Sequence, residues 1–278
     1  MSSKAEAAGV LLINGAPGGV IDWSDRGLQY GDGLFETISC VAGTPRWLAR
    51  HLERLRQGCA RLQLAPPDEA QLGTEIASLC RGQSRCLIKV IYTRGATAQR
   101  GYRPQAPSAQ RPTRIVARYP WNADAGGALR LGWSTVTLGD NPRLAGIKHL
   151  NRLEQVLAQA DMAGTDFDEM LMRSAGGAVI CGTMSNVFMP DGSVLRTPDL
   201  ASCGVAGVLR SLVLQCAPAA GFTVSIEPLN PKQLAATASL WVSNVRLGLR
   251  PVGWLDGREL EADPRLVRLQ ELVNATPA

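Results

Sequence analysis

Apolar residues in the first part of the chain recur with two periods, one typical of helices and one typical of strands. Residues 45–64 carry apolar side chains three and four positions apart, which predicts a helix with one apolar face, and residues 68–80 predict a second helix. Strands are predicted at residues 10–14, 33–40, 86–93 and 113–119, and a polar loop at residues 95–112. We therefore expect residues 1–119 to form a small α+β domain.

Residues 120–128 lose this periodicity and gain glycine, so they are expected to connect two domains. A larger second domain of mixed strands and helices is expected over residues 129–278. Its predicted strands are residues 129–138, 169–172, 178–181, 186–189, 222–227 and 239–244, and its predicted helices are residues 150–163, 207–219 and, as a weaker turn, 232–237. A loop containing Gly and Pro is expected after residue 244. A Rossmann nucleotide-binding unit is not expected, because no Gly-x-Gly-x-x-Gly follows a strand.

Composition restricts the class of protein. The 278 residues are 45% hydrophobic and 19% charged, which is typical of a globular chain. The sequence has no run of about 18 to 20 apolar residues that would span a bilayer, and residues 1–8 have no apolar core, so no membrane contact or export is expected. Seven cysteines, scattered and without a Cys-x-x-Cys pair, predict neither a disulfide framework nor a zinc cluster. We expect a cytoplasmic location, where thiols stay reduced.

Charge and histidine content restrict the chemistry. Twenty-nine basic and 24 acidic residues give a net charge of +5, but the arginines are dispersed, which favours small anionic ligands over nucleic acid. With only two histidines, His51 and His149, a multi-histidine metal site or a serine-histidine triad is not expected. No metal is therefore expected, and the chemistry must come from Lys, Arg, Cys, carboxylates or a cofactor.

The most informative segment is N-P-R-L-A-G-I-K-H-L-N-R-L-E at residues 141–154. Lys148 lies among apolar residues just before a predicted helix, where partial loss of hydration would lower the pKa of its amine and make it a nucleophile. From these residues alone, a solvated lysine near a helix start remains the alternative.

This lysine segment resembles that of the fold-type IV pyridoxal phosphate enzymes, and among them the aminodeoxychorismate lyases. The resemblance extends over almost the whole chain, in D-R-G-L-Q-Y-G-D-G-L-F-E-T at 25–37, R-H-L-E-R-L at 50–55, T-R-G at 93–95, Q-R-G-Y at 99–102, S-N-V-F at 185–188 and G-V-A-G-V-L-R at 204–210. It implies a two-domain α/β fold, a homodimer, pyridoxal 5'-phosphate as cofactor and a small-molecule substrate. The implied reaction converts 4-amino-4-deoxychorismate into 4-aminobenzoate and pyruvate for folate biosynthesis.

The resemblance also implies roles for individual residues. Lys148 would bind the cofactor covalently and move protons, with Thr37 as a second catalytic residue. The other implied cofactor ligands are Arg54 for the phosphate, the backbone of Val205 and Ala206 at a helix N-terminus, and Asn244 and Val245 in a second turn. The implied substrate contacts are Phe35, Arg94, Arg100, Tyr102 and Asn151.

One position departs from the family pattern. Before S-N-V-F the family carries a glutamate that binds the pyridine nitrogen of the cofactor, whereas this chain has Cys181. A carboxylate keeps the ring nitrogen of the cofactor protonated, and the charged ring then stabilises negative charge on the substrate. A protonated thiol is a weak donor without charge and would do this less well. This disfavours an aminotransferase more than a lyase. The alternatives are a fold-type IV amino acid aminotransferase, a degenerate paralogue with altered cofactor use, or Cys181 as a small apolar filler.

Overall fold

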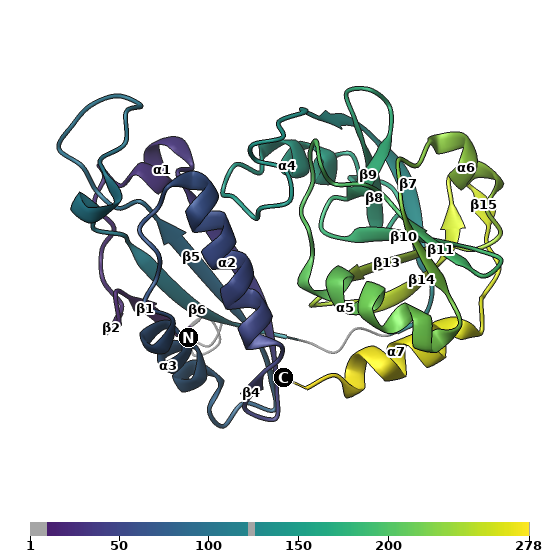
Figure 1. Cartoon of the computed structure of the whole chain (residues 1–278), viewed down its shortest axis with the longest axis horizontal. Helices are drawn as coiled ribbons and strands as arrows, with labels where there is room; N and C mark the ends of the chain where they lie inside the picture. Colours follow the sequence, from purple (N-terminus) through teal and green to yellow (C-terminus); the bar gives the residue numbers. More distant parts are fainter. Residues whose placement is uncertain (1–9, 122–125, 278) are drawn as a thin grey trace. The chain divides into compact units, whose positions relative to one another are not determined.

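The computed structural model describes residues 10–121 and 126–277 (Figure 1). The chain divides into two compact units. Unit 1 comprises residues 1–123, 147–151 and 277–278, and unit 2 comprises residues 124–146 and 152–276. Five residues from the middle of the chain, Ile147–Asn151, thus belong to unit 1 although both flanking segments belong to unit 2.

Unit 1 contains a six-stranded antiparallel sheet with the order β2-β1-β6-β5-β3-β4. The strands are β1 (Leu11–Ile13), β2 (Ala16–Pro17), β3 (Gly33–Val41), β4 (Thr44–Pro45), β5 (Arg85–Thr93) and β6 (Arg114–Pro120). The helices are α1 (Arg26–Tyr30), α2 (Leu48–Leu62), α3 (Glu69–Cys80) and the short 3-10 helix η1 (Pro107–Ala109). Contacts of α2 with β3, and of α3 with β4, β5 and β6, cover the sheet (Figure 1).

Alternation along β3 places buried core residues on one face of the unit 1 sheet and half-buried residues on the other. Leu34, Ile38 and Cys40 are buried. Gly58 of α2 allows this packing, because a Cβ atom at that position would lie 2.8 Å from Leu34 Cδ1. Phe35 alternates with these residues and is only half-buried, so its side chain points to the opposite face of the sheet.

The predicted elements of unit 1 are confirmed, with a later start for the first long helix. Residues 45–64 were expected to be helical, but α2 begins at Leu48, because Pro45 pairs with Cys40 in a β-hairpin and Trp47 has a φ of 53°. The helix expected at residues 68–80 is α3, and the Asp68 side chain accepts a hydrogen bond from the Gln71 amide at its N-terminus. The sequence analysis missed α1, whose five residues are too few for a periodic pattern.

Unit 2 contains a nine-stranded mixed sheet with the order β12-β11-β10-β13-β14-β7-β8-β9, and β15 also pairs with β14. The strands are β7 (Leu129–Leu138), β8 (Glu169–Ser174), β9 (Val179–Gly182), β10 (Asn186–Asp191), β11 (Val194–Thr197), β12 (Thr223–Ile226), β13 (Trp241–Asn244), β14 (Gly248–Leu255) and β15 (Arg258–Glu259). The helices are α4 (Leu153–Ala160), α5 (Val208–Cys216), η2 (Ala217–Ala220), α6 (Pro231–Ala236) and α7 (Arg265–Ala275). Parallel pairs join β7 to β8 and β14, and β11 to β12.

The strands predicted for unit 2 are confirmed, most of them with shifted ends. The loop expected after residue 244 is confined to residues 245–247, and its predicted Gly and Pro lie in a strand instead. Residues 248–255 form β14, which lies between β13 and β7 although it contains Gly253 and Pro251. Neighbours on both sides therefore override its weak local strand propensity. The sequence analysis also missed β11 and α7. The helix expected from residue 150 begins at Leu153, because the preceding residues pair with β3 instead.

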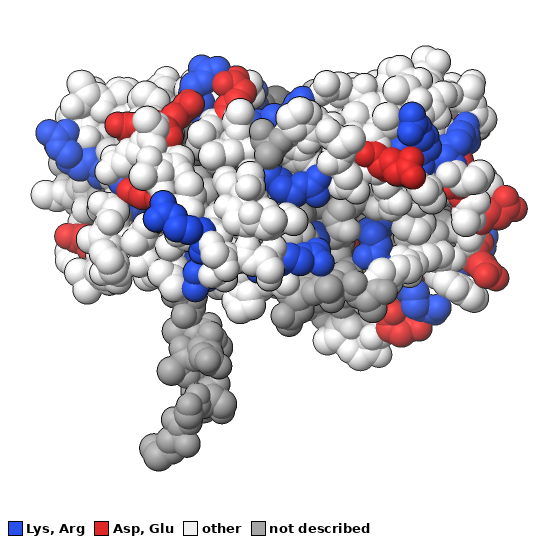
Figure 2. All heavy atoms as spheres, turned by 90° about the horizontal axis from the view of Figure 1, so that it is seen from below, with Lys and Arg blue, Asp and Glu red and all other residues white. Residues whose placement is uncertain are grey.

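The described surface carries mixed charge. Exposed ion pairs include Arg56–Glu53 and Arg268–Glu271, and Figure 2 shows basic and acidic side chains next to each other at several places on one face. Among the described residues, no helix is both long and apolar enough to cross a bilayer.

Candidate active site

The lysine segment runs beside the start of β3. The Phe35 amide donates to the Lys148 carbonyl at 2.9 Å, and the Leu150 amide donates to the Gly33 carbonyl at 3.0 Å. This pairing places the Lys148 amine 4.2 Å from the centre of the Phe35 ring. The structure therefore brings together two residues that the resemblance assigned to the site.

A second lysine lies against the same ring. The Lys89 amine is 4.0 Å from the centre of the Phe35 ring, and burial lowers its pKa. Thr37 is directly opposite Lys89 in the β3–β5 pair, so both side chains share the face of the sheet that carries Phe35. The sequence analysis missed Lys89. Its signal is a charged residue in the apolar run C-L-I-K-V-I, in a chain with only four lysines.

Arg54 is held by a buried carboxylate. Its Nε donates to Glu36 Oε1 at 2.7 Å and its Nη2 donates to Glu36 Oε2, while His51 Nδ1 contacts Oε2 at 2.7 Å. Burial opposes ionisation of Glu36, but the Arg54 charge and the His51 hydrogen bond hold its pKa at about 2. Burial lowers the pKa of His51, so this residue is neutral at pH 7 and donates from Nδ1. Glu36, which the sequence analysis did not single out, thus orients the guanidinium expected to bind phosphate.

The residues expected to contact substrate lie in two different settings. Arg94 is buried, and its guanidinium donates to Asp32 and to the carbonyl groups of Leu62 and Gln63. Asn151 Nδ2 donates to the Gly31 carbonyl at 3.2 Å. Arg100 is exposed, as is Tyr102, whose ring lies 5.4 Å from that of Tyr30. The structure thus gives Arg94 a role in fixing the end of α2, and it brings neither Arg100 nor Tyr102 to the Phe35 ring.

In unit 2, a tight turn precedes α5. Asn186 holds this turn from both sides, because its Nδ2 donates to the Val205 carbonyl at 2.8 Å and its Oδ1 accepts from the Gly207 amide at 3.1 Å. The Ala206 amide donates to the Gly146 carbonyl at 3.0 Å, and Lys148 follows Gly146 by two residues. The turn and the lysine segment are therefore coupled through the chain.

These contacts change how the turn would bind an anion. The Ala206 and Gly207 amides, as described, already donate hydrogen bonds. The first amides of α5, from Val208 onward, have no partners within the helix and point along its axis, which makes this terminus suitable for a phosphate. Asn186 is a further residue that the sequence analysis did not assign to the site, although S-N-V-F contains it.

The second expected phosphate turn follows β13. Asn244 Oδ1 accepts hydrogen bonds from the Arg246 and Leu247 amides at 2.9 and 2.8 Å, which closes a compact turn. Val245 is half-buried in this turn. The Asn244 side chain therefore shapes the turn, and the backbone is what remains to contact an anion.

Cys181 occupies β9, opposite Met172 of β8, and is 7% exposed. Burial, together with the nearby charge of Glu169, raises the pKa of its thiol to about 12. The thiol is therefore neutral at pH 7 and would give the cofactor ring no charged partner.

Glu169 is a buried carboxylate close to Cys181. Its oxygens accept hydrogen bonds from the amides of Met170, Thr183 and Met184 and from the hydroxyl groups of Thr183 and Ser185. This buried carboxylate orders the loop that follows Cys181.

The chain is similar in sequence and structure to proteins of known family. The profile of the amino-transferase class IV family matches residues 33–253. The chain belongs to this family. The chain is 32% identical to an aminodeoxychorismate lyase of Vibrio harveyi over 91% of its own length and 94% of that protein.

Two further relatives bear on the reaction. The crystal structure of 4-amino-4-deoxychorismate lyase from Pseudomonas aeruginosa is 37% identical, with a TM-score of 0.88, and the match covers 96% of this chain and 99% of the other. A putative branched-chain-amino-acid aminotransferase of Methanocaldococcus jannaschii is 30% identical over 84% of this chain and 82% of that protein. Membership of the class IV family confirms the two-unit α/β fold of the fold-type IV enzymes.

Proposed function

We propose that this protein is a pyridoxal phosphate-dependent aminodeoxychorismate lyase, which converts 4-amino-4-deoxychorismate into 4-aminobenzoate and pyruvate for folate biosynthesis. The observation that carries this proposal is the similarity to two such lyases, at 32% and 37% identity, over 91% and 96% of the chain. The family relationship supports the cofactor, because class IV enzymes of both reaction types use pyridoxal phosphate.

The residues present fit this cofactor. Lys148 would bind it covalently, and Arg54, oriented by Glu36, would pair with the phosphate. The turn before α5 is compact enough for backbone to approach an anion, because a Cβ atom at Gly207 would lie 2.1 Å from Asn186 Oδ1. The phosphate contacts would be completed by Val205, the first amides of α5 and the backbone of the Asn244–Val245 turn. The Ala206 amide could contribute only after breaking its hydrogen bond to the Gly146 carbonyl.

The side chains of this protein would bind and orient the substrate and would transfer protons. When bound, the cofactor supplies an electrophilic carbon for the substrate amine and an electron-accepting ring. Lys148 Nζ would take the proton from the ring carbon that carries the amine, and Thr37 would help to orient the substrate. Phe35 would shield one side of the Lys148 amine from water while its ring face stabilises the ammonium form. Loss of the enolpyruvyl group then leaves an aromatic product, which favours completion.

The two substrate carboxylates require cations. We propose that Lys89 binds one of these carboxylates, because its half-buried ammonium group lies against the same Phe35 ring as the Lys148 amine. The resemblance alone supports Arg100 as the other cation, and Tyr102 and Asn151 as further substrate contacts. Arg94 would act indirectly, since its guanidinium is bound to Asp32 and to the carbonyl groups at the end of α2.

An aminotransferase is the second candidate, supported by the relative from Methanocaldococcus jannaschii. The neutral, buried thiol of Cys181 disfavours it, because amino transfer depends more strongly than elimination on a charged partner for the cofactor ring. The third candidate, a paralogue without cofactor chemistry, is disfavoured by the retention of Lys148 and Arg54.

The deciding experiment measures 4-aminobenzoate release from aminodeoxychorismate by purified protein, after its visible spectrum has been recorded. We expect a yellow protein that forms product, and a Lys148→Ala variant that loses both the colour and the activity. Lys232→Ala, which changes an exposed lysine of α6, is the control and should retain both. A coloured protein without product that transfers amino groups would favour the aminotransferase, and a colourless, inactive one the degenerate paralogue.

We also propose that the protein is a cytoplasmic homodimer. All seven cysteines are free, as expected in a reducing compartment. One face of α4 exposes three apolar residues, Leu153, Val156 and Leu157, with 77%, 60% and 57% of their surfaces accessible. An apolar stripe of this kind on a surface helix is typical of an interface, and we assign it to a second copy of the chain.

A further inference from the structure

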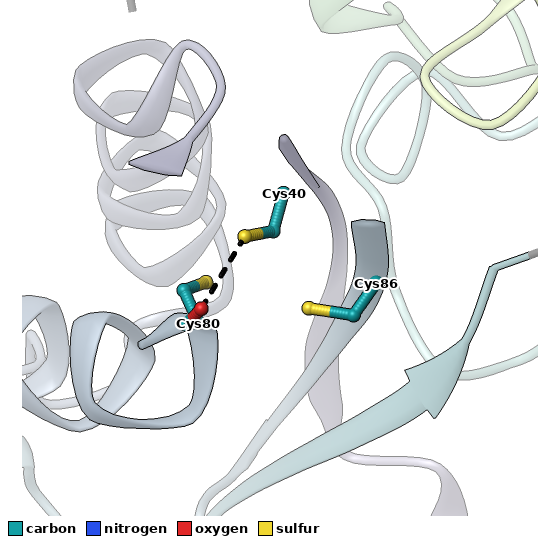
Figure 3. A group of neighbouring side chains, drawn as sticks. All are labelled: Cys40, Cys80 and Cys86. Atoms are coloured by element: carbon teal, nitrogen blue, oxygen red, sulfur yellow. Dashed lines mark hydrogen bonds between the residues drawn. The ribbon is translucent and has the colours of Figure 1, made fainter. Parts of the chain in front are cut away.

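Three cysteines that are far apart in the sequence meet at one end of the unit 1 sheet (Figure 3). Cys40 lies near the end of β3, Cys80 ends α3, and Cys86 lies near the start of β5. Their sulfur atoms all lie within 4.8 Å of one another, and the three residues are 0%, 0% and 1% exposed. The Cys40 thiol donates to the Cys80 carbonyl oxygen at 3.9 Å. No local sequence pattern indicates this cluster, because strand register and helix packing create it.

The cluster offers sulfur ligands alone. Among the described residues, no histidine or carboxylate belongs to this group. Burial raises the pKa of Cys80, and it raises the pKa of Cys86 to about 11 although the Arg118 charge opposes this. At pH 7 these two thiols are therefore protonated and neutral. Any ligand that replaces the thiol protons must leave a complex that is stable in an apolar interior.

Charge and coordination number select the ligand. Structural zinc sites are almost always four-coordinate, and a divalent ion held by three thiolates would leave one negative charge in the core. A trivalent centre with three thiolates is neutral and has a complete set of ligands. Sulfur ligands on bonds of about 2.3 Å lie about 4 Å apart or less, so small side-chain rotations would bring these sulfurs into position.

We propose that Cys40, Cys80 and Cys86 form a binding site for a trivalent arsenical, with arsenous acid as the simplest ligand. Three S–H bonds and three As–O bonds break, while three As–S bonds and three O–H bonds form, so that three waters leave. No electron is transferred, and a neutral thiol cluster and a neutral acid give a neutral product.

Access requires local opening. The Ala42 amide donates to the Ser84 carbonyl and the Gly43 amide to the Gln83 carbonyl, each at 2.8 Å, so two neighbouring turns close this end of the sheet. Turns of this kind open more readily than the core does. Binding is therefore slow, and once formed the complex links α3, β3 and β5 and raises the melting temperature of the protein.

The test titrates the reduced, cofactor-loaded protein with sodium arsenite in a thiol-free phosphine reductant and measures protein-bound arsenic after gel filtration. One arsenic per chain is expected for the wild type. Cys80→Ala and Cys86→Ala should each weaken binding by more than about tenfold, since loss of even an outer partner of a metal ligand costs 10- to 100-fold in affinity. Cys59→Ala removes another buried thiol of unit 1, in α2, and should bind like the wild type.

Results of two kinds would overturn the proposal. One is wild-type protein that binds no arsenic, or variants at positions 80 and 86 that bind as tightly as the wild type. The other is zinc bound by the same cysteines more tightly than arsenite, which would contradict the charge argument. Circular dichroism verifies that each variant is folded, and Cys86→Val replaces any alanine variant that is not.

Discussion

Glu36 shows how a single buried charge links two segments of the candidate site. Glu36 follows Phe35 and precedes Thr37 in β3, its side chain points to the opposite, buried face of the sheet, and its carboxylate holds Arg54 of α2. Replacing it by glutamine would remove the negative charge beside the mostly buried Arg54 guanidinium. We expect Glu36→Gln to lower the free energy of unfolding by about 3 to 5 kcal/mol and to weaken cofactor binding. Urea denaturation and a cofactor titration followed by absorbance measure the two effects.

Glu53→Gln is the matched control. Glu53 lies on α2 next to Arg54, and its exposed side chain forms an ion pair with Arg56. Water and salt screen an exposed ion pair, so this variant should remain close to the wild type in its free energy of unfolding. Equal destabilisation by both substitutions would show that burial of Glu36 does not increase its contribution to the free energy of unfolding.

The same carboxylate predicts an acid dependence. The pKa of Glu36 is about 2 in the folded chain, against an ordinary value of 4.5. A carboxyl group with a lowered pKa contributes stability above its ordinary pKa, and this contribution is lost as the pH falls from about 4.5 towards about 2. Unfolding midpoints measured across this range should fall less steeply in Glu36→Gln than in the wild type. Parallel curves for the two proteins would contradict this assignment.

Cys181 carries the prediction that separates the two reactions. Its thiol is neutral at the position where the resemblance implies a carboxylate, and the nearby Glu169 carboxylate already accepts several hydrogen bonds. We expect Cys181→Glu to increase amino transfer from D-alanine or a branched-chain amino acid to a keto acid, relative to 4-aminobenzoate formation. Cys181→Ser keeps a neutral side chain and should preserve the wild-type ratio. If both variants keep that ratio, Cys181 does not face the cofactor ring.

At this scale the sequence predicted the residues that carry a motif and missed those that act through tertiary contacts. Lys148 and Phe35 belong to recognisable segments, and the structure places them side by side. Lys89 joins them only because the register of β3 and β5 sets Thr37 opposite it. Glu36 and Asn186 stand within motifs, but their partners are distant in the chain. Such contacts depend on packing that no local pattern encodes.

Among the elements, the turn before α5 depends on the absence of one side chain. A Cβ atom at Gly207 would lie 2.1 Å from Asn186 Oδ1, so alanine there must displace the side chain that holds the turn. We expect Gly207→Ala to weaken cofactor affinity by at least about tenfold, corresponding to about 1.4 kcal/mol, measured as retention of the yellow absorbance on dilution. Gly176→Ala, at another turn of unit 2 with its nearest neighbour at 3.8 Å, should change little. Unchanged affinity in Gly207→Ala would remove this turn from the phosphate site.

Elements with a clear period were predictable, and those defined by their neighbours were not. The spacing of apolar residues predicted α2, but the start of this helix depends on the hairpin of β3 and β4 and on the left-handed conformation of Trp47. Strand β14 contains Gly and Pro, which suggested a loop, yet β13 and β7 supply hydrogen-bonding partners on both sides. Local propensity therefore predicted the type of most elements, whereas pairing decided their ends.

For the molecule as a whole, the exposed face of α4 predicts self-association. We expect the double substitution Leu153→Glu and Val156→Glu to convert a dimer into a monomer, because two charges would replace apolar surface at the interface. Light scattering after gel filtration measures the mass. Val267→Glu, at an equally exposed apolar position of α7, is the control and should leave the dimer intact. A wild-type monomer, or a double variant that remains dimeric, would rule out this face.

The assignment of Ile147–Asn151 to unit 1 has a consequence for biosynthesis. When residues 1–123 have left the ribosome, the start of β3 still lacks the strand segment that pairs with Leu34 and Phe35. That segment follows more than twenty residues later, after β7 has also been made. Lys148, the proposed catalytic lysine, therefore joins a sheet that is already partly folded, and a nascent chain arrested before residue 147 would present an incomplete sheet to chaperones.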